Sequence, residues 1–132
     1  MITNKTGSSF VDVEVSLLDA NDNNPTFIPN NVYEFNITTD SKSGDHVGQI
    51  HAIDPDLGRN GMVLYSIQAE NNISSFIKID NRTGRMTLFK APKSTGRHLL
   101  FVEAADQPLN PSERRTSLAV ITVNVKNPGK LI

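Results

Sequence analysis

Apolar and polar residues alternate along this chain in short runs, and Gly, Pro, Asn and Asp separate one run from the next. Alternation with a period of two is typical of strands that bury one face, because successive side chains of a strand point to opposite sides. The alternating apolar positions are Val11, Val13, Val15 and Leu17; Tyr33, Phe35 and Ile37; Val47, Ile50 and Ala52; Val63, Tyr65 and Ile67; Phe76 and Ile79; Met86 and Leu88; Leu100, Val102 and Ala104; and Ala119, Ile121, Val123 and Val125. The pattern predicts an all-β protein without a convincing helix.

The spacing of these runs predicts how the chain is divided. Seven runs follow Pro25 within about a hundred residues, so we expect a seven-stranded antiparallel Greek-key sandwich of the immunoglobulin-like kind over residues 26–126. The strand at residues 10–18 is one too many for that unit, and Pro25 has no N–H with which to continue a ladder. Residues 1–18 are therefore interpreted as the last strand of a preceding unit, residues 19–25 as a linker, and residues 127–132 as a tail or a second linker.

Composition and charge exclude several classes of partner. The chain has 132 residues, 13 basic and 14 acidic, and its net charge of −1 offers no field that would recruit nucleic acid or an anionic membrane. The absence of cysteine excludes disulfides and thiolate metal sites. No stretch approaches the ~20 apolar residues of a membrane span, so we expect no direct membrane insertion by this segment, and any membrane anchor or signal peptide of a parent protein to lie outside it.

Four Asn-x-Ser/Thr triplets are candidate acceptors of N-glycans, at Asn4, Asn36, Asn72 and Asn81. Such triplets also arise by chance, and they carry meaning only if the chain passes through the secretory pathway.

Acidic side chains gather at strand ends. Asp54 and Asp56 are two residues apart at the end of one strand, so their carboxylates are expected to point to the same side. Asp106 ends another strand, and the Asn60-Gly61 turn is expected to offer a backbone carbonyl nearby. Three carboxylates in one place repel one another unless a cation neutralises them, and Ca²⁺ prefers carboxylate, amide and carbonyl oxygens.

The polar linker adds oxygens of the same kind. It offers the Asn21 amide, the Asp22 carboxylate and the backbone carbonyls of Ala20 and Asn23. Each piece alone is usually a solvated turn or loop. The fixed order of linker, Asp pair, Asn-Gly turn and final Asp within one sandwich-length unit makes a calcium site the favoured interpretation.

These motifs resemble those of the cadherin family over about residues 10–126. They are Leu18-Asp-Ala-Asn-Asp-Asn-Asn-Pro-Thr-Phe27, Ala52-Ile-Asp-Pro-Asp-Leu-Gly-Arg-Asn-Gly61, Tyr65-Ser-Ile67, Phe76-Ile-Lys-Ile-Asp80 with Thr83-Gly84, and Leu100-Phe-Val-Glu-Ala-Ala-Asp106. The resemblance implies an extracellular, calcium-dependent repeat in the ectodomain of a single-pass adhesion protein, with neighbouring repeats and other cadherins as partners. It also implies the ligands of an innermost ion, namely Asn21, Asn23, Asp54, Asp56, Asn60 and Asp106, whereas Asp22, Ala20 and a shared Asp56 would serve outer ions.

The far end of the unit departs from the family pattern. Thr39, with Asp40 one place off, stands where a Glu is expected, and Ala91-Pro92-Lys93 replaces Asp-Arg-Glu. The second linker reads Lys126-Asn-Pro-Gly-Lys130 in place of Asp-x-Asn-Asp-Asn. These differences predict a calcium-free, more easily bent junction at the C-terminal end. Among long cadherins they are most similar to the tip-link protocadherins of hair bundles and their insect microvillar relatives.

Two other functional classes remain to be weighed. A calcium-stabilised carbohydrate-binding sandwich would also present carboxylates, but it usually needs exposed aromatic residues, and this chain has no Trp. An enzyme is disfavoured because the Asp54 and Asp56 spacing is poor for flanking a glycosidic bond and no nucleophile elbow or phosphate loop is present.

Overall fold

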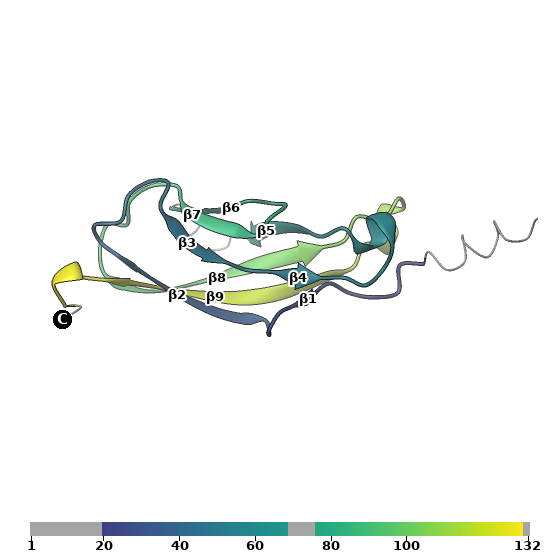
Figure 1. The fold of residues 1–132 in the computed structure, drawn as a ribbon, viewed down its shortest axis with the longest axis horizontal. Coiled ribbons are helices and arrows are strands. Elements are labelled where there is room, and N and C mark those ends of the chain that lie inside the picture. Colours follow the sequence, from purple (N-terminus) through teal and green to yellow (C-terminus); the bar gives the residue numbers. More distant parts are fainter. Residues whose placement is uncertain (1–19, 69–75, 131–132) are drawn as a thin grey trace, which may run out of the picture.

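The computed structural model describes residues 20–68 and 76–130, and in this part the chain forms nine strands and three short 3-10 helices (Figure 1). The strands are β1 (Thr26–Phe27), β2 (Val32–Thr38), β3 (His46–Gln49), β4 (Ala52–Ile53), β5 (Leu64–Gln68), β6 (Ile77–Ile79), β7 (Arg85–Leu88), β8 (Gly96–Ala105) and β9 (Thr116–Lys126). The 3-10 helices are η1 (Gly58–Gly61), η3 (Pro111–Glu113) and η4 (Pro128–Lys130). The predicted strand at residues 10–18 lies outside the described residues.

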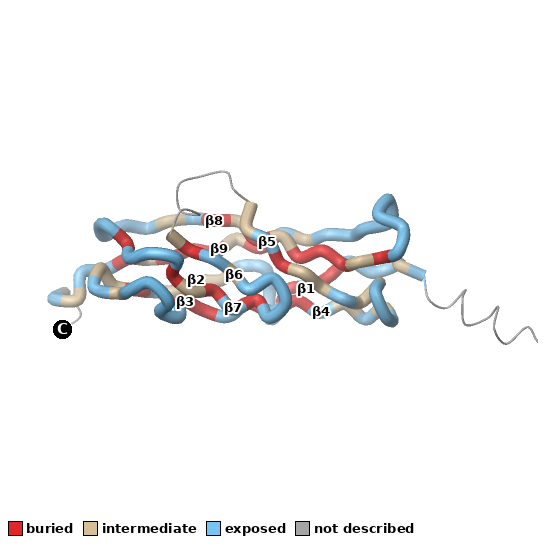
Figure 2. Tube along the Cα trace, turned by 90° about the horizontal axis from the view of Figure 1, so that it is seen from above, coloured by how far each residue is buried: buried red, intermediate tan, exposed pale blue. Residues whose placement is uncertain are grey.

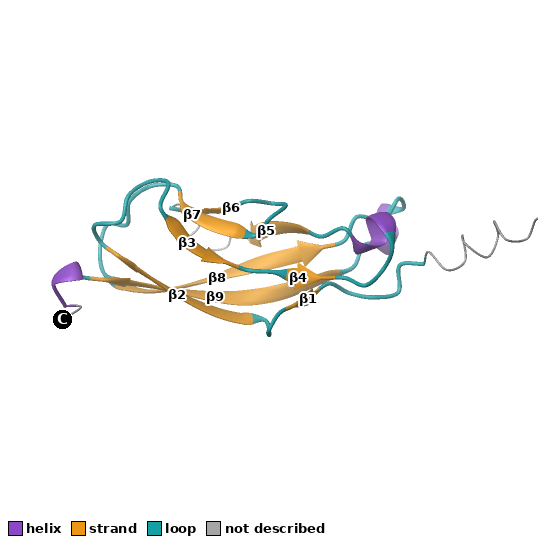
Figure 3. Ribbon diagram, in the orientation of Figure 1, coloured by secondary structure: helices purple, strands orange, loops and turns teal. Residues whose placement is uncertain are grey.

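Seven strands form the two layers of a sandwich, as predicted. One sheet has the order β2-β9-β8-β5 and the other the order β3-β7-β6, while β1 and β4 form a separate pair. Figure 3 shows β2, β9 and β8 in one layer and β3, β7 and β6 in the other. All pairs are antiparallel except that of β2 with β9, which runs parallel from Val32 opposite Val120 to Thr38 opposite Lys126. Parallel neighbours need a long connection, and here almost the whole domain separates the two strands.

The single strand that the sequence predicts over Val47, Ile50 and Ala52 is wrong, because this stretch is divided into two strands. β3 pairs with β7, and β4 pairs with β1. A register shift between His46 and Gly48 buries the neighbouring residues Val47 and Gly48, which strict alternation forbids. The predicted alternation of buried and exposed residues therefore breaks at the bulge, where one extra residue shifts the side chains that follow to the opposite face.

The core lies between the two sheets and runs the length of the body (Figure 2). It consists of Phe27, Ile37, Val47, Ile50, Ala52, Tyr65, Ile77, Met86, Leu88, Leu100, Val102, Ala104, Ala119, Ile121, Val123 and Val125. Phe27, two residues after the linker, contacts the rings of Tyr33 and Tyr65, so the start of the repeat is fixed in the core. Residue 20 and residue 130 lie at opposite ends of the elongated body (Figure 1).

Candidate metal centre

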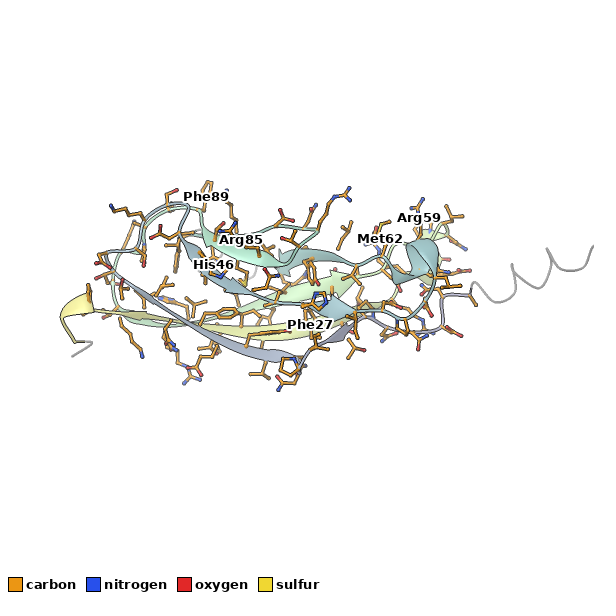
Figure 4. All side chains as sticks on the ribbon, viewed as in Figure 1. Phe27, His46, Arg59, Met62, Arg85 and Phe89 are labelled. Atoms are coloured by element: carbon orange, nitrogen blue, oxygen red, sulfur yellow. The ribbon has the colours of Figure 1, made fainter. Side chains whose placement is uncertain are left out.

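Three aspartates from distant parts of the chain meet at the end of the sandwich that carries η1, where Figure 4 labels Arg59. Asp54 follows β4, Asp56 lies two residues further on, and Asp106 follows β8. One carboxylate oxygen of each lies within 4.8 Å of the others. In residues 20–68 and 76–130, this is the one group of three His, Cys, Asp or Glu side chains arranged so as to hold a metal ion.

Three buried oxygens at this end have no hydrogen-bond partner in the described part of the chain. They are Oδ1 of Asn21, Oδ2 of Asp54 and Oδ2 of Asp106. Asp106 is completely buried, and only its Oδ1 has a partner, the backbone N–H of Arg115 at 2.8 Å. A buried carboxylate oxygen without a partner costs more than a neutral polar group in the same position. The oxygens therefore fit a hard cation, because Ca²⁺ accepts carboxylate and amide oxygens together.

The pKa of the Asp54 carboxyl reflects its burial close to the other two carboxylates. Burial raises this pKa above its ordinary value of 3.8, while the N–H of Asp56, which donates to Asp54 Oδ1 at 3.0 Å, lowers it. The negative charges of Asp56 and Asp106 raise it further. A cation would act in the opposite direction, because it favours the charged form of every carboxylate around it.

Asp56 is joined directly to the linker. The backbone N–H of Asn23 donates to Asp56 Oδ2 at 3.1 Å, and the Asn23 amide donates to Asp56 Oδ1 at 2.6 Å. Removal from water raises the pKa of Asp56, but these hydrogen bonds outweigh it and hold the pKa below 3.8. Asp56 is therefore kept charged by the linker, beside an Asp54 that resists ionisation.

A second set of bonds joins the linker to the connection between β8 and β9. Arg115 Nε donates to the Asn21 carbonyl at 3.0 Å, and Arg115 Nη1 donates to Asn24 Oδ1 at 2.7 Å. The Asn21 amide donates to the carbonyl of Glu113 at 2.6 Å. Sequence reasoning missed Arg115 as a linker contact, since its partners lie more than ninety residues away and no local motif marks the pairing.

Gly61 allows the segment from Asp54 to Asp56 to fold tightly. A Cβ at Gly61 would overlap the backbone carbonyl oxygen of Asp56 and approach that of Asp54 to 3.1 Å. Backbone atoms cannot move aside as a flexible side chain can, so only Gly fits here. The Asn60-Gly61 turn of the sequence analysis is the end of η1 in the structure.

The sequence matches the Cadherin domain family over residues 33–126. The chain belongs to the cadherin family. Membership places this repeat among extracellular adhesion modules rather than enzymes, in agreement with the sequence analysis.

Cadherin-89D of Drosophila melanogaster is 48% identical over 123 residues, which cover 92% of this chain and 5% of that cadherin. Human Protocadherin-15 is 38% identical over 119 residues, 89% of this chain and 6% of the relative. This chain therefore spans about a twentieth of the length of these cadherins.

Solved cadherin structures have the same fold. Mouse clustered PcdhgC3 EC1-3 superposes with a TM-score of 0.75 at 29% identity, over 83% of this chain and 35% of that one. Mouse Cadherin-23 EC22-24 superposes with a TM-score of 0.73 at 24% identity, over 81% of this chain and 33% of that one. The predicted sandwich fold is thus confirmed.

The remaining ligand residues predicted for this cadherin repeat are placed as follows. Asp22 is exposed and its Oδ1 accepts from the Asn23 amide at 3.2 Å. Ala20 is exposed at the start of the described chain. The N–H of Asn60 donates to the Leu57 carbonyl at 3.2 Å within η1.

Two of the four glycosylation triplets lie in the described part of the cadherin repeat. Asn36 is exposed on β2, and Asn81 is exposed in the turn between β6 and β7. Asn4 and Asn72 lie outside the described residues. None of the helices in residues 20–68 and 76–130 has the length and apolar character of a membrane span.

The opposite end of the cadherin repeat has a different composition. At this end β2 finishes at Thr38, whose hydroxyl donates to Asp40, and the N–H of Thr39 donates to the Lys126 carbonyl at 3.0 Å. Lys93 and Lys126 are exposed. Asn127 Oδ1 accepts from the N–H of Gly129 at 3.0 Å.

Proposed function

We propose that this chain is a calcium-binding repeat of a cell-surface cadherin, with calcium at its N-terminal linker and a calcium-free junction at its C-terminal end. The observation that carries the proposal is the meeting of three aspartates within 4.8 Å, two of which bury an oxygen that has no partner in the described chain. Calcium supplies the positive charge and the coordination that this set of oxygens demands.

The ligand set follows from the residues at this end. The proposed ligands of the innermost ion are Asn21, the Asn23 carbonyl, Asp54, Asp56, the Asn60 carbonyl and Asp106, and Asp22 and the Ala20 carbonyl serve outer ions with Asp56 shared. Two facts support this set. The linker already contacts Asp56, and the orphan oxygens of Asn21, Asp54 and Asp106 belong to it.

Binding at this position would stiffen the junction with a preceding repeat. Asn21 and Asn23 belong to the linker, whereas Asp54 and Asp106 follow strands of the sandwich. A cation held by both groups fixes the linker to the sandwich end, which reduces the bending expected of an ordinary interdomain segment. The repeat would then transmit force along an extracellular chain on the surface of a cell, next to other repeats and other cadherins.

The C-terminal junction is proposed to lack calcium because it offers cations where ligands would be needed. Lys93 and Lys126 are exposed there, and Asp40 is the nearest acidic residue in sequence to the position of the missing Glu. Without ions to freeze it, this junction should bend more easily than the N-terminal one.

Titration calorimetry with Ca²⁺ tests the proposal on three forms of the chain: unmodified, Asp106→Asn and Asp40→Asn. The first substitution removes one ligand charge at the N-terminal end and should weaken calcium binding about tenfold or more, because ligand charge sets the affinity of such sites. The second removes one acidic charge at the C-terminal end and should leave the affinity unchanged. Equal calcium affinity in the Asp106→Asn form would refute the proposed ligand set.

A further inference from the structure

On the outer face of the four-stranded sheet most side chains are exposed or half-buried, and Ala105 and Thr122 are the buried ones on β8 and β9. Along β2, β8 and β9 the buried residues alternate with side chains that point away from the core. Five of these outward residues are apolar, and we name them the outer-sheet patch. They are Val32, Leu99, Phe101, Leu118 and Val120.

The strand register places these five residues side by side. Val32 lies opposite Val120, and Val120 lies opposite Phe101, so three strands contribute one apolar row. Leu99 is two residues from Phe101 on β8, and Leu118 is two residues from Val120 on β9, so both lie on the same face. Val32, Leu118 and Leu99 are 62%, 51% and 46% exposed. A contiguous apolar patch of this kind marks an interaction site more often than scattered apolar residues do.

Two opposite charges flank the patch on one strand. Arg97 and Glu103 lie on β8 and point to the outer face with Leu99 and Phe101 between them. The two charged residues are six positions apart, which is about 20 Å along a strand. Their midpoint is Leu100, whose partner on β9 is Ile121. A twofold axis through this midpoint, lying in the plane of the interface and perpendicular to the strands, would exchange the two charged positions.

We propose that the outer-sheet patch binds a second copy of this chain, face to face and with the two repeats antiparallel. In this arrangement Arg97 of each copy faces Glu103 of the other, and Leu99 of each copy faces Phe101 of the other. An isologous contact of this kind is the commonest way in which identical chains associate. The proposal deepens the adhesive part of the proposed function, because it names the partner and the surface, and it is independent of the calcium site.

Charge complementarity selects the antiparallel arrangement over its alternative. A twofold axis parallel to the strands would leave residues at the same height opposite each other, so Glu103 would meet the apolar Leu118 row of its partner. Neither charge would find an opposite charge, and both would be desolvated. The antiparallel arrangement pairs the four charges of the two β8 strands around an apolar centre, which is the composition of stable interfaces. Glu34 on the edge strand β2 lies on the same face, where its carboxylate accepts a hydrogen bond from the Asn124 amide at 2.7 Å.

The size of the face sets the expected strength. Four strands at about 4.8 Å spacing and a length of about 20 Å give a footprint of roughly 400 Å². This is less than the roughly 800 Å² that each partner buries in a standard interface, so the dimer should be weak and become useful through many repeats in parallel.

Sedimentation velocity on the 132-residue chain tests the proposal by charge reversal. The chain is produced without glycans, because the side chain of Asn36 is exposed on β2 of the same sheet. The unmodified chain should dimerise reversibly at high micromolar concentration. Arg97→Glu and Glu103→Arg should each raise the dimer dissociation constant at least about tenfold, because like charges would then face each other. The double variant Arg97→Glu with Glu103→Arg should restore the dissociation constant of the unmodified chain. Lys78→Glu, a reversal on β6 of the other sheet, should have no effect.

Three outcomes would overturn the proposal: a chain that stays monomeric, single reversals that dimerise normally, or a double reversal that fails to recover. Calcium titration of the same variants separates this result from that of the metal centre, since all four should bind calcium as the unmodified chain does. Loss of dimerisation with intact calcium binding would confirm the patch, and loss of both in the single reversals would show a folding defect and contradict it.

Discussion

Asp54 shows how one residue can oppose folding and support binding. Its carboxyl is partly buried, one of its oxygens has no partner in the described chain, and two other carboxylates lie beside it. Burial and these charges raise its pKa above 3.8. A group whose pKa is raised on folding stabilises the fold only in its neutral form, so this stabilisation is present below pH 3.8 and is lost as the pH rises through the folded pKa.

We therefore expect Asp54→Asn to change calcium affinity and metal-free stability in opposite directions. At pH 7 in chelator, the variant should melt at a higher temperature than the unmodified chain, because an amide carries no charge to bury. In calcium the variant should melt at a lower temperature, because it lacks a ligand. Differential scanning calorimetry under both conditions measures the two shifts.

The comparison across pH is the control for this prediction. In chelator, the advantage of Asp54→Asn should shrink as the pH falls toward 3.8, because the native carboxyl becomes neutral as well. A variant that is less stable than the unmodified chain in chelator at pH 7 would show that Asp54 is satisfied without a cation.

The pKa of Asp80 is shifted in the opposite direction to that of Asp54, by hydrogen bonds within a single turn. The backbone N–H groups of Thr83 and Arg82 donate to Asp80 Oδ1 at 2.9 and 2.8 Å, and they hold the pKa of Asp80 below 3.8. This turn joins β6 to β7. A group with a depressed folded pKa stabilises the fold above its unfolded pKa, and this stabilisation is lost as the pH falls through the folded value.

Asp80→Asn should accordingly lower the melting temperature at pH 7, since a neutral amide oxygen accepts these two hydrogen bonds less strongly than a carboxylate does. The difference from the unmodified chain should shrink below pH 3.8 and vanish once the pH has fallen through the lower pKa of the folded chain. Thermal melts followed by circular dichroism from pH 7 to pH 2 measure it. A difference that persists unchanged to pH 2 would mean that shape rather than charge is responsible.

The linker and the connection between β8 and β9 behave as one element. Arg115 contacts Asn21 and Asn24, and its own N–H donates to Asp106. These contacts hold the linker against the sandwich end without an ion. We expect Arg115→Ala to weaken calcium binding several-fold, because the linker ligands would have to be ordered when the ion binds.

Arg114→Ala is the matched control for Arg115→Ala. Arg114 is the exposed neighbour in sequence, has the same charge, and makes only a backbone bond to Pro111 among the contacts described here. Isothermal titration of both variants with Ca²⁺ separates position from charge. Loss of the positive charge by itself would tighten calcium binding slightly in either variant. Weaker binding by Arg115→Ala alone would therefore identify the tether, and tighter binding in both variants would contradict it.

The strands could be predicted from the sequence only where the alternation of apolar and polar residues along the chain is enough to define them. Alternation identified β2, β8 and β9, whose buried residues follow strict parity through most of their length. It failed between β3 and β4, because the division depends on two different partner strands and on a bulge. It could not indicate that β2 and β9 run parallel, since that depends on the path of the whole chain.

At the scale of the whole molecule, the candidate site could be predicted where residue type and strand end coincide. Asp54, Asp56 and Asp106 each end a strand or follow one closely, so their meeting follows from the sandwich topology. The tether through Arg115 could not be predicted, because it depends on a side chain that reaches across a loop. The two ends of the molecule differ in their side chains, with the cluster of Asp54, Asp56 and Asp106 at one end and the exposed Lys93 and Lys126 at the other.

This difference between the two ends predicts that calcium protects one end of the repeat only. Amide hydrogen exchange followed by mass spectrometry, with and without Ca²⁺, should slow in the linker, around η1 and in the connection between β8 and β9, because binding to the folded form suppresses local opening there. Exchange in Thr38 to Ser41 and Lys126 to Gly129 should not change. Equal protection at both ends would mean that the C-terminal junction holds calcium despite Lys93 and Lys126, and the flexible joint would then have to be abandoned.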